Sequence, residues 1–444
     1  MASGTRSRPR GRSRDRGAQT SGSEPARRAT GSAPRGEATG PLHLRTRRGQ
    51  GGSFRLQRLV LVELAVAVVL VGAAVGAVAL VPAAVLAVGL VLLAFVRRRG
   101  RSLPEWLVVA RGLRARQRRA AGLVVPAGIE PGLAPVVECE PGLRTCSFGG
   151  REPRPVGMVG DGTFLSAVVQ VEADVTALRA ERGRQPLPVA LVRDALEVDG
   201  IRLESAQIVL HTQPAPALHL PQHSVAVTNY LPLQEQTGAP AVRIVWIALK
   251  LDPELCREAV AARGGGLVGA QKCLARVADH LASRLTGAGF RTTVLDEEEL
   301  TAALATSTCA NPLVTAEAGR TGTRERRTEE SGRSWRCDNR RHTTYWVRRW
   351  PQVGGSGASL AQLVGVLTSV PALATTFSLT LWRGERQETA LCGHVRVTGR
   401  SDDELVAARR ALQDAARRAG AQLARLDREQ VPGMLATLPL GGAR

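Results

Sequence analysis

A long run of uncharged residues constrains this chain more than any other feature of its sequence. From Leu64 to Val96, 33 consecutive residues include no Asp, Glu, Lys, Arg or His. One membrane-spanning helix needs roughly 20 apolar residues, so the run is too long for one span and suits two short ones. Val81-Pro82 lies past its middle, where a turn could separate two helices. We therefore predict a transmembrane hairpin at residues 55–99, with helices at roughly Leu59–Leu80 and Pro82–Val96.

Arginine on both sides of this run sets the expected orientation. Arg55 and Arg58 precede it, and Arg97 is the first of four closely spaced arginines that follow it. Flanks rich in Lys and Arg stay on the cytoplasmic side of a membrane. Two crossings put both flanks on that side, so we expect a bacterial plasma-membrane protein with both termini and its large domain in the cytoplasm. The alternative is one long tilted helix, which would place the C-terminal part outside the cell.

The basic character of the chain is concentrated around the hairpin. Of a net charge of +21, residues 1–58 contribute 14 arginines against three acidic residues, and residues 97–119 contribute nine against one. Residues 120–444 hold 37 basic and 34 acidic residues. Topology and attraction to lipid headgroups explain this distribution, so we expect anionic membrane lipids, and no nucleic acid, as partners. Residues 1–54 have few large apolar side chains and are predicted to be a disordered basic leader.

Residues 100–155 are predicted to form a juxtamembrane amphipathic helix and a linker. An apolar face recurs at helical spacing, and arginines follow it. A basic amphipathic helix suits the surface of the inner leaflet, but it could equally pack on a partner subunit. The apolar residues are Leu103, Trp106, Leu107 and Ala110, and the arginines are Arg111, Arg114, Arg116, Arg118 and Arg119.

The rest of the chain alternates strand-like and helix-like runs. We predict an α+β, or mixed α/β, cytosolic domain in two parts, 156–305 and 335–444, separated by a Thr- and Arg-rich mobile loop at 306–334. One apolar stripe at helical spacing runs from Leu274 to Leu285 and another from Leu405 to Leu426. The strand-like runs are Thr163–Val171, Ser205–His211, Val242–Leu251, Phe290–Leu295, Thr343–Trp350, Thr375–Trp382 and Glu388–Thr398.

A glycine-rich segment at 264–269 is the first candidate for ligand binding. It contains a GxGxxG pattern ahead of a helix, and a helix N-terminus can hold phosphate. A dinucleotide fingerprint needs a strand directly before the glycines, whereas a helix is expected here from Pro253 to Ala262. Ala270 stands where the lysine of a P-loop would be. We therefore favour a tight joint between two helices.

An enzymatic alternative uses the same segment. Asp296 to Glu299 is a run of four acidic residues at a predicted helix start, where the helix dipole favours negative charge. If this run faced the 264–269 loop across a cleft, the chain would be a membrane-tethered enzyme acting on a nucleotide or nucleotide-sugar. The sequence contains no nucleophile elbow, no zinc-protease motif and no placed Ser/His/Asp set. We therefore predict no catalytic or cofactor-binding residues and a chain that is not an enzyme.

The seven cysteines are odd in number and irregular in spacing, which favours free thiols in a reducing cytoplasm. Cys309, Cys337 and His342 hint at a metal, but structural zinc usually has two close pairs of ligands. Cys139 with Cys146 does not supply the missing pair. We therefore predict no metal site.

The segment Trp335–Trp350 interleaves aromatic residues with arginine. Such a pattern can stack on single-stranded nucleic acid. On a strand, however, alternate residues share one face, and Trp, Tyr and Arg are enriched at protein interfaces. We predict a sheet face in the core or in a subunit interface, formed by His342, Thr344, Trp346, Arg348 and Trp350.

Several segments in a fixed order resemble a known family. With the basic leader, the Arg-flanked hairpin and the large soluble domain, they are similar to EccE, the conserved component E of the actinobacterial type VII (ESX-like) secretion system. The resemblance covers roughly residues 55–440. The segments are Trp246–Pro253, Arg263–Gly266, Leu295–Leu300, Glu330–Trp335 and His342–Pro351.

The resemblance implies a non-enzymatic, membrane-anchored structural subunit that helps to assemble or stabilise an inner-membrane channel for small WXG-type proteins. Its expected partners are the components EccB, EccC and EccD and a mycosin protease. ATP hydrolysis would belong to EccC, so no cofactor is expected for this chain.

Overall fold

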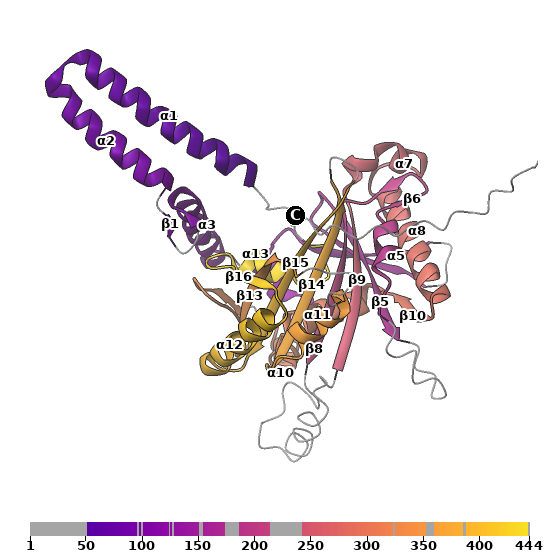
Figure 1. Ribbon diagram of the computed structural model, residues 1–444. Helices are drawn as coiled ribbons and strands as arrows, with labels where there is room; N and C mark the ends of the chain where they lie inside the picture. Colours follow the sequence, from indigo (N-terminus) through magenta and orange to yellow (C-terminus); the bar gives the residue numbers. More distant parts are fainter. Residues whose placement is uncertain are drawn as a thin grey trace, which may run out of the picture. The chain divides into compact units, whose positions relative to one another are not determined.

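A computed structural model describes most of the chain after the leader. The described residues are 51–95, 97–98, 101–123, 125–126, 128–150, 154–173, 186–213, 242–322, 325–351, 359–384 and 388–442. Nearly all of the predicted leader lies outside them. Along the chain, a pair of helices is followed by a short strand hairpin and then by a domain built on a large sheet (Figure 1).

The uncharged run folds into α1 (Gly51–Val75) and α2 (Ala77–Phe95), which pack side by side (Figure 1). Gly72 allows a close approach, because a Cβ there would lie 2.4 Å from the Cβ of Ala83. The chain reverses at Gly76, whose φ of 129° favours glycine. The turn expected at Val81-Pro82 was therefore misplaced, and Pro82 lies inside α2. Among the described residues, no helix is both long and apolar enough to cross a membrane.

The next residues contain more structure than the predicted helix and linker. After β1 (Arg97–Arg98) and β2 (Arg101–Ser102), the expected amphipathic helix is present as α3 (Leu103–Ala121). It is followed by α4 (Ala134–Cys139) and by β3 (Arg144–Phe148). The supposed linker therefore supplies an edge strand to the large sheet.

That sheet has 12 strands, and every strand pair described in it is antiparallel, which makes the domain α+β. Its main order is β11-β12-β13-β15-β14-β8-β9-β5-β4-β3, with β10 beside β5 and β16 beside β13. The bounds are β4 (Val156–Gly160), β5 (Leu165–Ala173), β8 (Ser205–Gln213), β9 (Val242–Leu251), β10 (Phe290–Val294), β11 (Thr328–Glu330), β12 (Trp335–Cys337), β13 (Arg340–Arg349), β14 (Ala374–Arg383), β15 (Thr389–Gly399) and β16 (Gln422–Arg425).

The same succession of elements occurs twice in the domain. The first half runs β5, α5, β8, β9, α8, β10, α9, and the second runs β13, α11, β14, β15, α12, β16, α13. The spatial orders, β8-β9-β5-β10 and β14-β15-β13-β16, are identical and are those of a ferredoxin-like βαββαβ unit. β8 and β14, equivalent strands of the two halves, pair and join them into one sheet. The helices are α5 (Val189–Asp194), α8 (Gly266–Gly287), α9 (Glu297–Thr308), α11 (Leu360–Thr368), α12 (Asp402–Arg418) and α13 (Gln430–Leu435).

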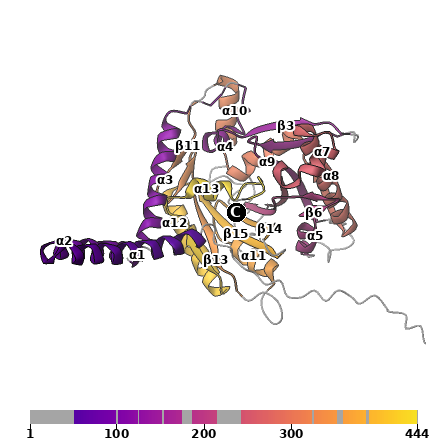
Figure 2. The ribbon, with the colours of Figure 1, turned by 90° about the horizontal axis from the view of Figure 1, so that it is seen from above.

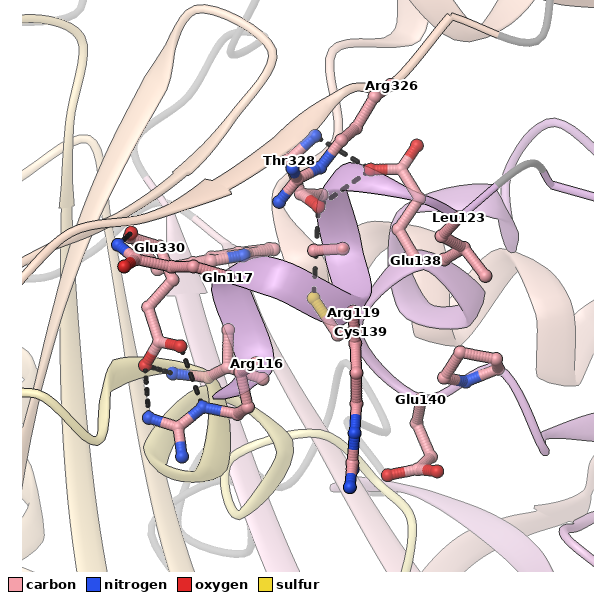
Figure 3. A pocket seen from close by; sticks show the side chains of 14 residues that line it. Arg116, Gln117, Arg119, Leu123, Glu138, Cys139, Glu140, Arg326, Thr328 and Glu330 are labelled. Atoms are coloured by element: carbon pink, nitrogen blue, oxygen red, sulfur yellow. Dashed lines mark hydrogen bonds and ion pairs between the residues drawn. The ribbon is translucent and has the colours of Figure 1, made fainter. Parts of the chain in front are cut away.

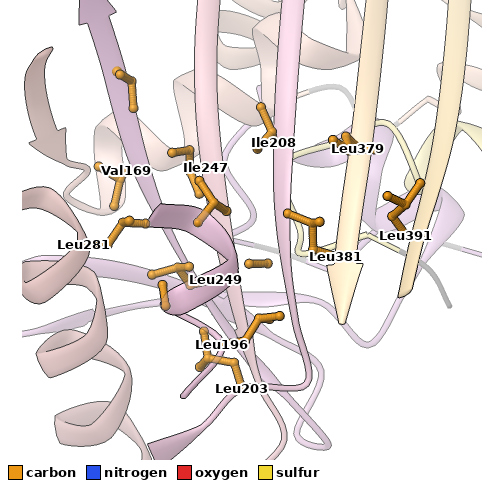
Figure 4. Close-up of a cluster of buried hydrophobic side chains, with 14 of the residues drawn as sticks. Val169, Leu196, Leu203, Ile208, Ile247, Leu249, Leu281, Leu379, Leu381 and Leu391 are labelled. Atoms are coloured by element: carbon orange, nitrogen blue, oxygen red, sulfur yellow. The ribbon is translucent and has the colours of Figure 1, made fainter. Parts of the chain in front are cut away.

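One face of the sheet is apolar and carries the crossover helices of both halves. Strand residues such as Val169, Ile247 and Leu379 pack there against α5, α8, α11 and α12. Figure 4 shows part of this core, with Leu281 of α8 beside the strands. Figure 2 shows these helices from a second direction. Because apolar side chains on alternate strand positions meet helices with one apolar stripe, this face forms the larger core.

The opposite face mixes apolar and polar side chains and lies under α4, α9, α13 and the C-terminal segment 436–442. Gln207 of β8 binds this segment twice, donating to the Ala436 carbonyl at 2.9 Å and accepting from the Gly441 amide at 2.8 Å. Ser166 and Ser205 donate to carbonyls of the same segment at 2.8 and 2.7 Å. These three buried polar side chains thus find backbone partners in the C-terminal segment.

All seven predicted strands are present, but three other expectations are corrected. Residues 306–334 contain helix α10 (Pro312–Thr321), capped by Asn311, and strand β11 in place of a loop. The last long helix ends at Arg418, because the chain turns at Gly420 and then forms β16. A bulge between Val347 and Arg349 turns Trp350 to the apolar face, edge-on to Phe377, so it does not share a face with Trp346.

Candidate interface around helix α3

Helix α3 is held against the second half by an ion pair with a buried carboxylate. Arg116 donates from Nε and Nη2 to the two carboxylate oxygens of Glu330 at 2.8 and 3.0 Å. Glu330 lies on β11 with its side chain 4% exposed, and it also accepts from the Val431 amide at 3.0 Å. Two parallel bonds between a guanidinium and a carboxylate fix orientation as well as distance. The pair therefore sets which side of α3 faces the domain.

Three further contacts support the same docking. The Nη2 of Arg116 donates to the Arg428 carbonyl at 2.6 Å, and Gln117 donates to the Glu330 carbonyl at 2.9 Å. The Arg428 guanidinium lies 4.3 Å from the ring centroid of Trp106, which is a cation–π distance. The sequence left open whether this helix lies on the membrane or packs on a partner subunit. In the structure, one side of the helix packs on the chain's own domain.

A cavity of about 350 Å³ lies beside α3, between it, α4 and strands β11 and β12 (Figure 3). Six of the 14 lining residues are charged, and two of the carboxylates are already bound. Glu330 is paired with Arg116, and Glu138 accepts from the Thr328 amide and hydroxyl at 2.8 and 2.6 Å. The charged lining residues are Arg116, Arg119, Arg326, Glu138, Glu140 and Glu330.

The cavity also contains the thiol of Cys139. Cys139 lies 4.0 Å from the Thr328 hydroxyl, and burial raises the pKa of its thiol to about 12. A protonated thiol is a poor nucleophile. Burial and then Asp161 raise the pKa of Glu140, while Arg119 acts in the opposite direction. The groups around Cys139 therefore do not activate it.

The glycine segment forms the helix–turn–helix joint expected from the sequence. It connects α7 (Arg257–Ala262), which follows a single 3-10 turn (Pro253–Cys256), to α8. Gly264, Gly265 and Gly266 have φ values of 110°, 70° and 54°. A Cβ at Gly269 would lie 2.4 Å from the Val260 carbonyl oxygen, so glycine allows the two helices to touch. A dinucleotide fingerprint requires a strand directly before the glycines, and helix α7 stands in that place here.

The acidic run begins α9 as predicted. Asp296 accepts from the Glu299 amide at 2.9 Å, and Glu299 accepts in return from the Asp296 amide at 3.1 Å, which forms a capping box. The bond from the Glu299 amide holds the pKa of Asp296 below its usual range. Arg154 pairs with both carboxylates. Two of the four acidic residues are therefore used to stabilise a helix start.

The cysteines and histidine considered for a metal lie in the interior. His342 and Cys309 both contact the Thr398 hydroxyl, through Nδ1 at 2.9 Å and Sγ at 3.8 Å. Burial, then the nearby Arg396, holds the pKa of His342 well below its usual range. Cys337 is fully buried in the smaller core. Within the described ranges, no three potential ligands gather closely enough to hold a metal ion.

Arg396 is fully buried on the mixed face, and no pattern in the sequence drew attention to it. Its guanidinium donates to the Ser307 carbonyl in the last turn of α9 and to the Thr376 hydroxyl at 3.3 Å. Burial lowers its pKa, but an arginine stays protonated in proteins. The negative end of the α9 dipole offsets part of this charge. The residue therefore joins the second half of the sheet to the end of α9, the last helix of the first.

The aromatic segment belongs to the core. Trp335 and Tyr345 are fully buried, and Trp346 packs against the cluster of Trp382, Ala390 and Cys392. Trp335 also stacks at 4.8 Å from His342. These contacts confirm the core interpretation for this part of the segment, and burial leaves the rings of Trp335 and Tyr345 unavailable for stacking on nucleic acid bases.

Comparison with known protein families gives one match, to about a quarter of the chain. Residues 239–347 match the EccE family model. The family is described as a putative type VII ESX secretion system translocon, EccE. The match confirms the resemblance over these residues, which include β9 and β10 of the first half and most of β13 of the second. No curated protein matches the chain.

Sequence reasoning missed the residues that dock α3. Arg116 appeared only as one of a run of arginines, and Glu330 only as the first residue of a family-like segment. They are 214 residues apart, so no local spacing connects them. The sequence carried no signal for this pair, because the burial of Glu330 is visible only in the structure, where a buried carboxylate calls for a partner.

Proposed function

We propose that this chain is a non-enzymatic, membrane-anchored structural subunit of a type VII secretion complex. The observation that carries the proposal is the family match at 239–347. In this role the chain helps to assemble or stabilise the inner-membrane channel that exports small WXG-type proteins. The fold supports an assembly role, because the conspicuous charged and aromatic residues of the domain are used in capping, docking and core packing.

Anchoring by α1 and α2 is part of the proposal. Sixteen large apolar side chains of these two helices are exposed, and Val78 reaches 92%. Exposed apolar surface of this extent is unusual for a soluble monomer and marks a protein or membrane contact. With arginines on both flanks, two crossings would keep both termini and the large domain in the cytoplasm. The proposed partners are EccB, the ATPase EccC, EccD, a mycosin and anionic lipids.

The test is isolation of the chain from its native membrane in a gentle detergent, with identification of the co-purified proteins by mass. We expect one large complex that contains an ATPase of the EccC type and a multi-span channel protein. A clean monomer, under conditions that keep other membrane complexes intact, would refute the proposal.

A second measurement distinguishes the proposed structural role from the enzymatic alternative. An enzyme that used the 264–269 loop would bind a nucleotide, and binding to the folded state raises the unfolding temperature. We expect saturating nucleotide or nucleotide-sugar to leave the unfolding temperature of the full chain unchanged. A clear increase, abolished by Gly264→Val, would favour the alternative.

A further inference from the structure

Docking of α3 leaves the other side of the helix uncovered. Arg111, Arg114 and Arg118 follow one another at helical spacing, so they lie on one side, roughly opposite Arg116. All three are exposed. Leu107 and Val108, one or two turns earlier, are also exposed, at 38% and 53%. The uncovered side is therefore an apolar start followed by a stripe of arginines, which we call the Arg stripe (Arg111, Arg114 and Arg118).

Charge on this helix is mostly positive, and its one acidic residue, Glu105, lies in the first turn. From Trp106 to Leu123 the sequence has five arginines and no acidic residue. Arg116 is used in the pair with Glu330, whereas no hydrogen bond or ion pair holds the Arg stripe to the described part of the chain. Arginine presents a planar fork that matches phosphate oxygens. The chemistry of the stripe therefore calls for a phosphate or carboxylate partner.

The short connection between α2 and α3 indicates which partner supplies the phosphate or carboxylate. Only seven residues separate the end of α2 at Phe95 from the start of α3 at Leu103. Fully extended, they span at most roughly 25 Å, and the β1–β2 hairpin shortens this reach. If α2 ends at a membrane surface, α3 begins close to the headgroups. Exposed Leu107 and Val108, followed by arginine, fit a helix that enters the boundary between headgroups and acyl chains.

We propose that the Arg stripe binds the phosphates of anionic phospholipids while Arg116 holds the other side of α3 to the domain. This inference rests on the proposed membrane anchoring. It makes α3 a fixed connection between the bilayer surface and the second half of the domain. Each arginine near an anionic surface adds to the attraction, so removal of three is expected to weaken it at least tenfold.

The experiment uses the full chain in an uncharged detergent, with phosphatidylglycerol or phosphatidylcholine titrated into the micelles and bound lipid counted by native mass spectrometry. We expect a preference for phosphatidylglycerol that falls at least tenfold in Arg111→Gln/Arg114→Gln/Arg118→Gln and falls with added salt. The matched control removes the same charge from α12, as Arg410→Gln/Arg417→Gln/Arg418→Gln, and keeps the preference. These six residues are exposed, so both variants are expected to fold.

Two results would overturn the inference. One is an unchanged preference in the α3 variant, and the other is an equal loss in both variants, which would reflect net charge alone. If the α3 variant keeps its lipid preference but loses the partner proteins in the native-membrane isolation, the stripe binds protein and the lipid assignment is wrong, while the proposed function stands. Failure of the unaltered chain to recover any partner counts against the proposed function alone.

Discussion

The two halves of the sheet share one topology but fill the same face differently. In the first half, β5 and β9 place Val168, Trp246 and Ala248 on the face that carries the C-terminal segment. In the second half, the equivalent strands β13 and β15 place Thr344, His394 and Arg396 there. Strand order and register therefore do not dictate the character of this core.

Several buried polar groups on this face take hydrogen-bond partners from other parts of the chain. Arg396 needs the carbonyl at the end of α9, and His211 needs the Thr376 hydroxyl, 2.9 Å from its Nδ1. An unpaired polar group in the interior would cost about 1–3 kcal/mol. The comparison thus predicts that the apolar half depends on packing volume and the polar half on hydrogen bonding and protonation.

Truncation of Trp246 should have the largest effect. Trp246 and His394 occupy equivalent positions on either side of the β8–β14 junction, through the cross-strand pairs of Val209 and Ser378. We expect Trp246→Ala to lower the free energy of unfolding by about 3–5 kcal/mol, because it removes a large buried ring. Urea denaturation of the full chain in uncharged detergent, followed by circular dichroism, measures this. His394→Ala should cost about 1–2 kcal/mol, and equal losses would remove the distinction between the halves.

Acid should next weaken the polar part of this face, to which β8 of the first half contributes His211 where it pairs with β14. Burial lowers the pKa of His211 to about 3 and that of His394 to about 4, and it holds the pKa of His342 well below its usual range. Below an unfolded pKa of about 6.5, the unfolded chain binds protons that the folded chain excludes, so stability falls as the pH falls. From pH 7 to 5.5 we expect a loss of roughly 1 kcal/mol per histidine, or roughly 3 kcal/mol in total.

Urea denaturation at both pH values tests this loss. His211→Gln should remove about one third of it, whereas His280→Gln, on α8, should leave it unchanged. A loss of the same size in a variant that lacks all three buried histidines would assign the acid sensitivity to other groups.

A methyl group added to the C-terminal segment at Gly441 should have a smaller effect on stability. Gly441 has a φ of 95°, and a Cβ there would lie 2.4 Å from the Cβ of Lys250. We expect Gly441→Ala to lower the free energy of unfolding by about 2–3 kcal/mol, from backbone strain plus overpacking. The matched control, Gly420→Ala, also has a positive φ of 72°, but its Cβ would meet Pro351 only at 3.6 Å. Equal costs in the two variants would show that contact with the sheet does not matter.

The smallest effect is expected at the domain edges. Glu330 is buried under α3 in the second half, whereas the Arg154 pairs at the start of α9 in the first half are exposed. We expect Arg116→Gln to cost about 1–2 kcal/mol, because it removes a charged partner from a buried carboxylate. Arg154→Gln should leave the denaturation midpoint unchanged, since exposed pairs contribute little. Limited proteolysis should also cleave the chain after α3 faster in Arg116→Gln than in the unaltered chain, and at an unchanged rate in Arg154→Gln.

Local patterns predicted local structure well in this chain. Alternating or β-branched runs located seven strands, and the acidic run that begins at Asp296 correctly marked the start of α9. The glycine joint at 264–269 was predicted because helix spacing ran up to it on both sides. Two predictions failed for local reasons. The chain reverses at Gly76 and not at the expected Val81-Pro82, and a bulge after Val347 moves Trp350 to the other face of the sheet.

The sequence by itself therefore determined most of the helices and strands and the concentration of excess positive charge around the uncharged run. It also determined an ordered set of segments similar to EccE. Only the tertiary structure showed that two equivalent halves join at β8 and β14, and that Arg116 meets Glu330 across 214 positions. The physical reason is one of range. Periodicity, capping and turn residues act within a few positions, whereas strand order, the pairing of a buried charge and the free side of a helix are set by contacts between distant segments.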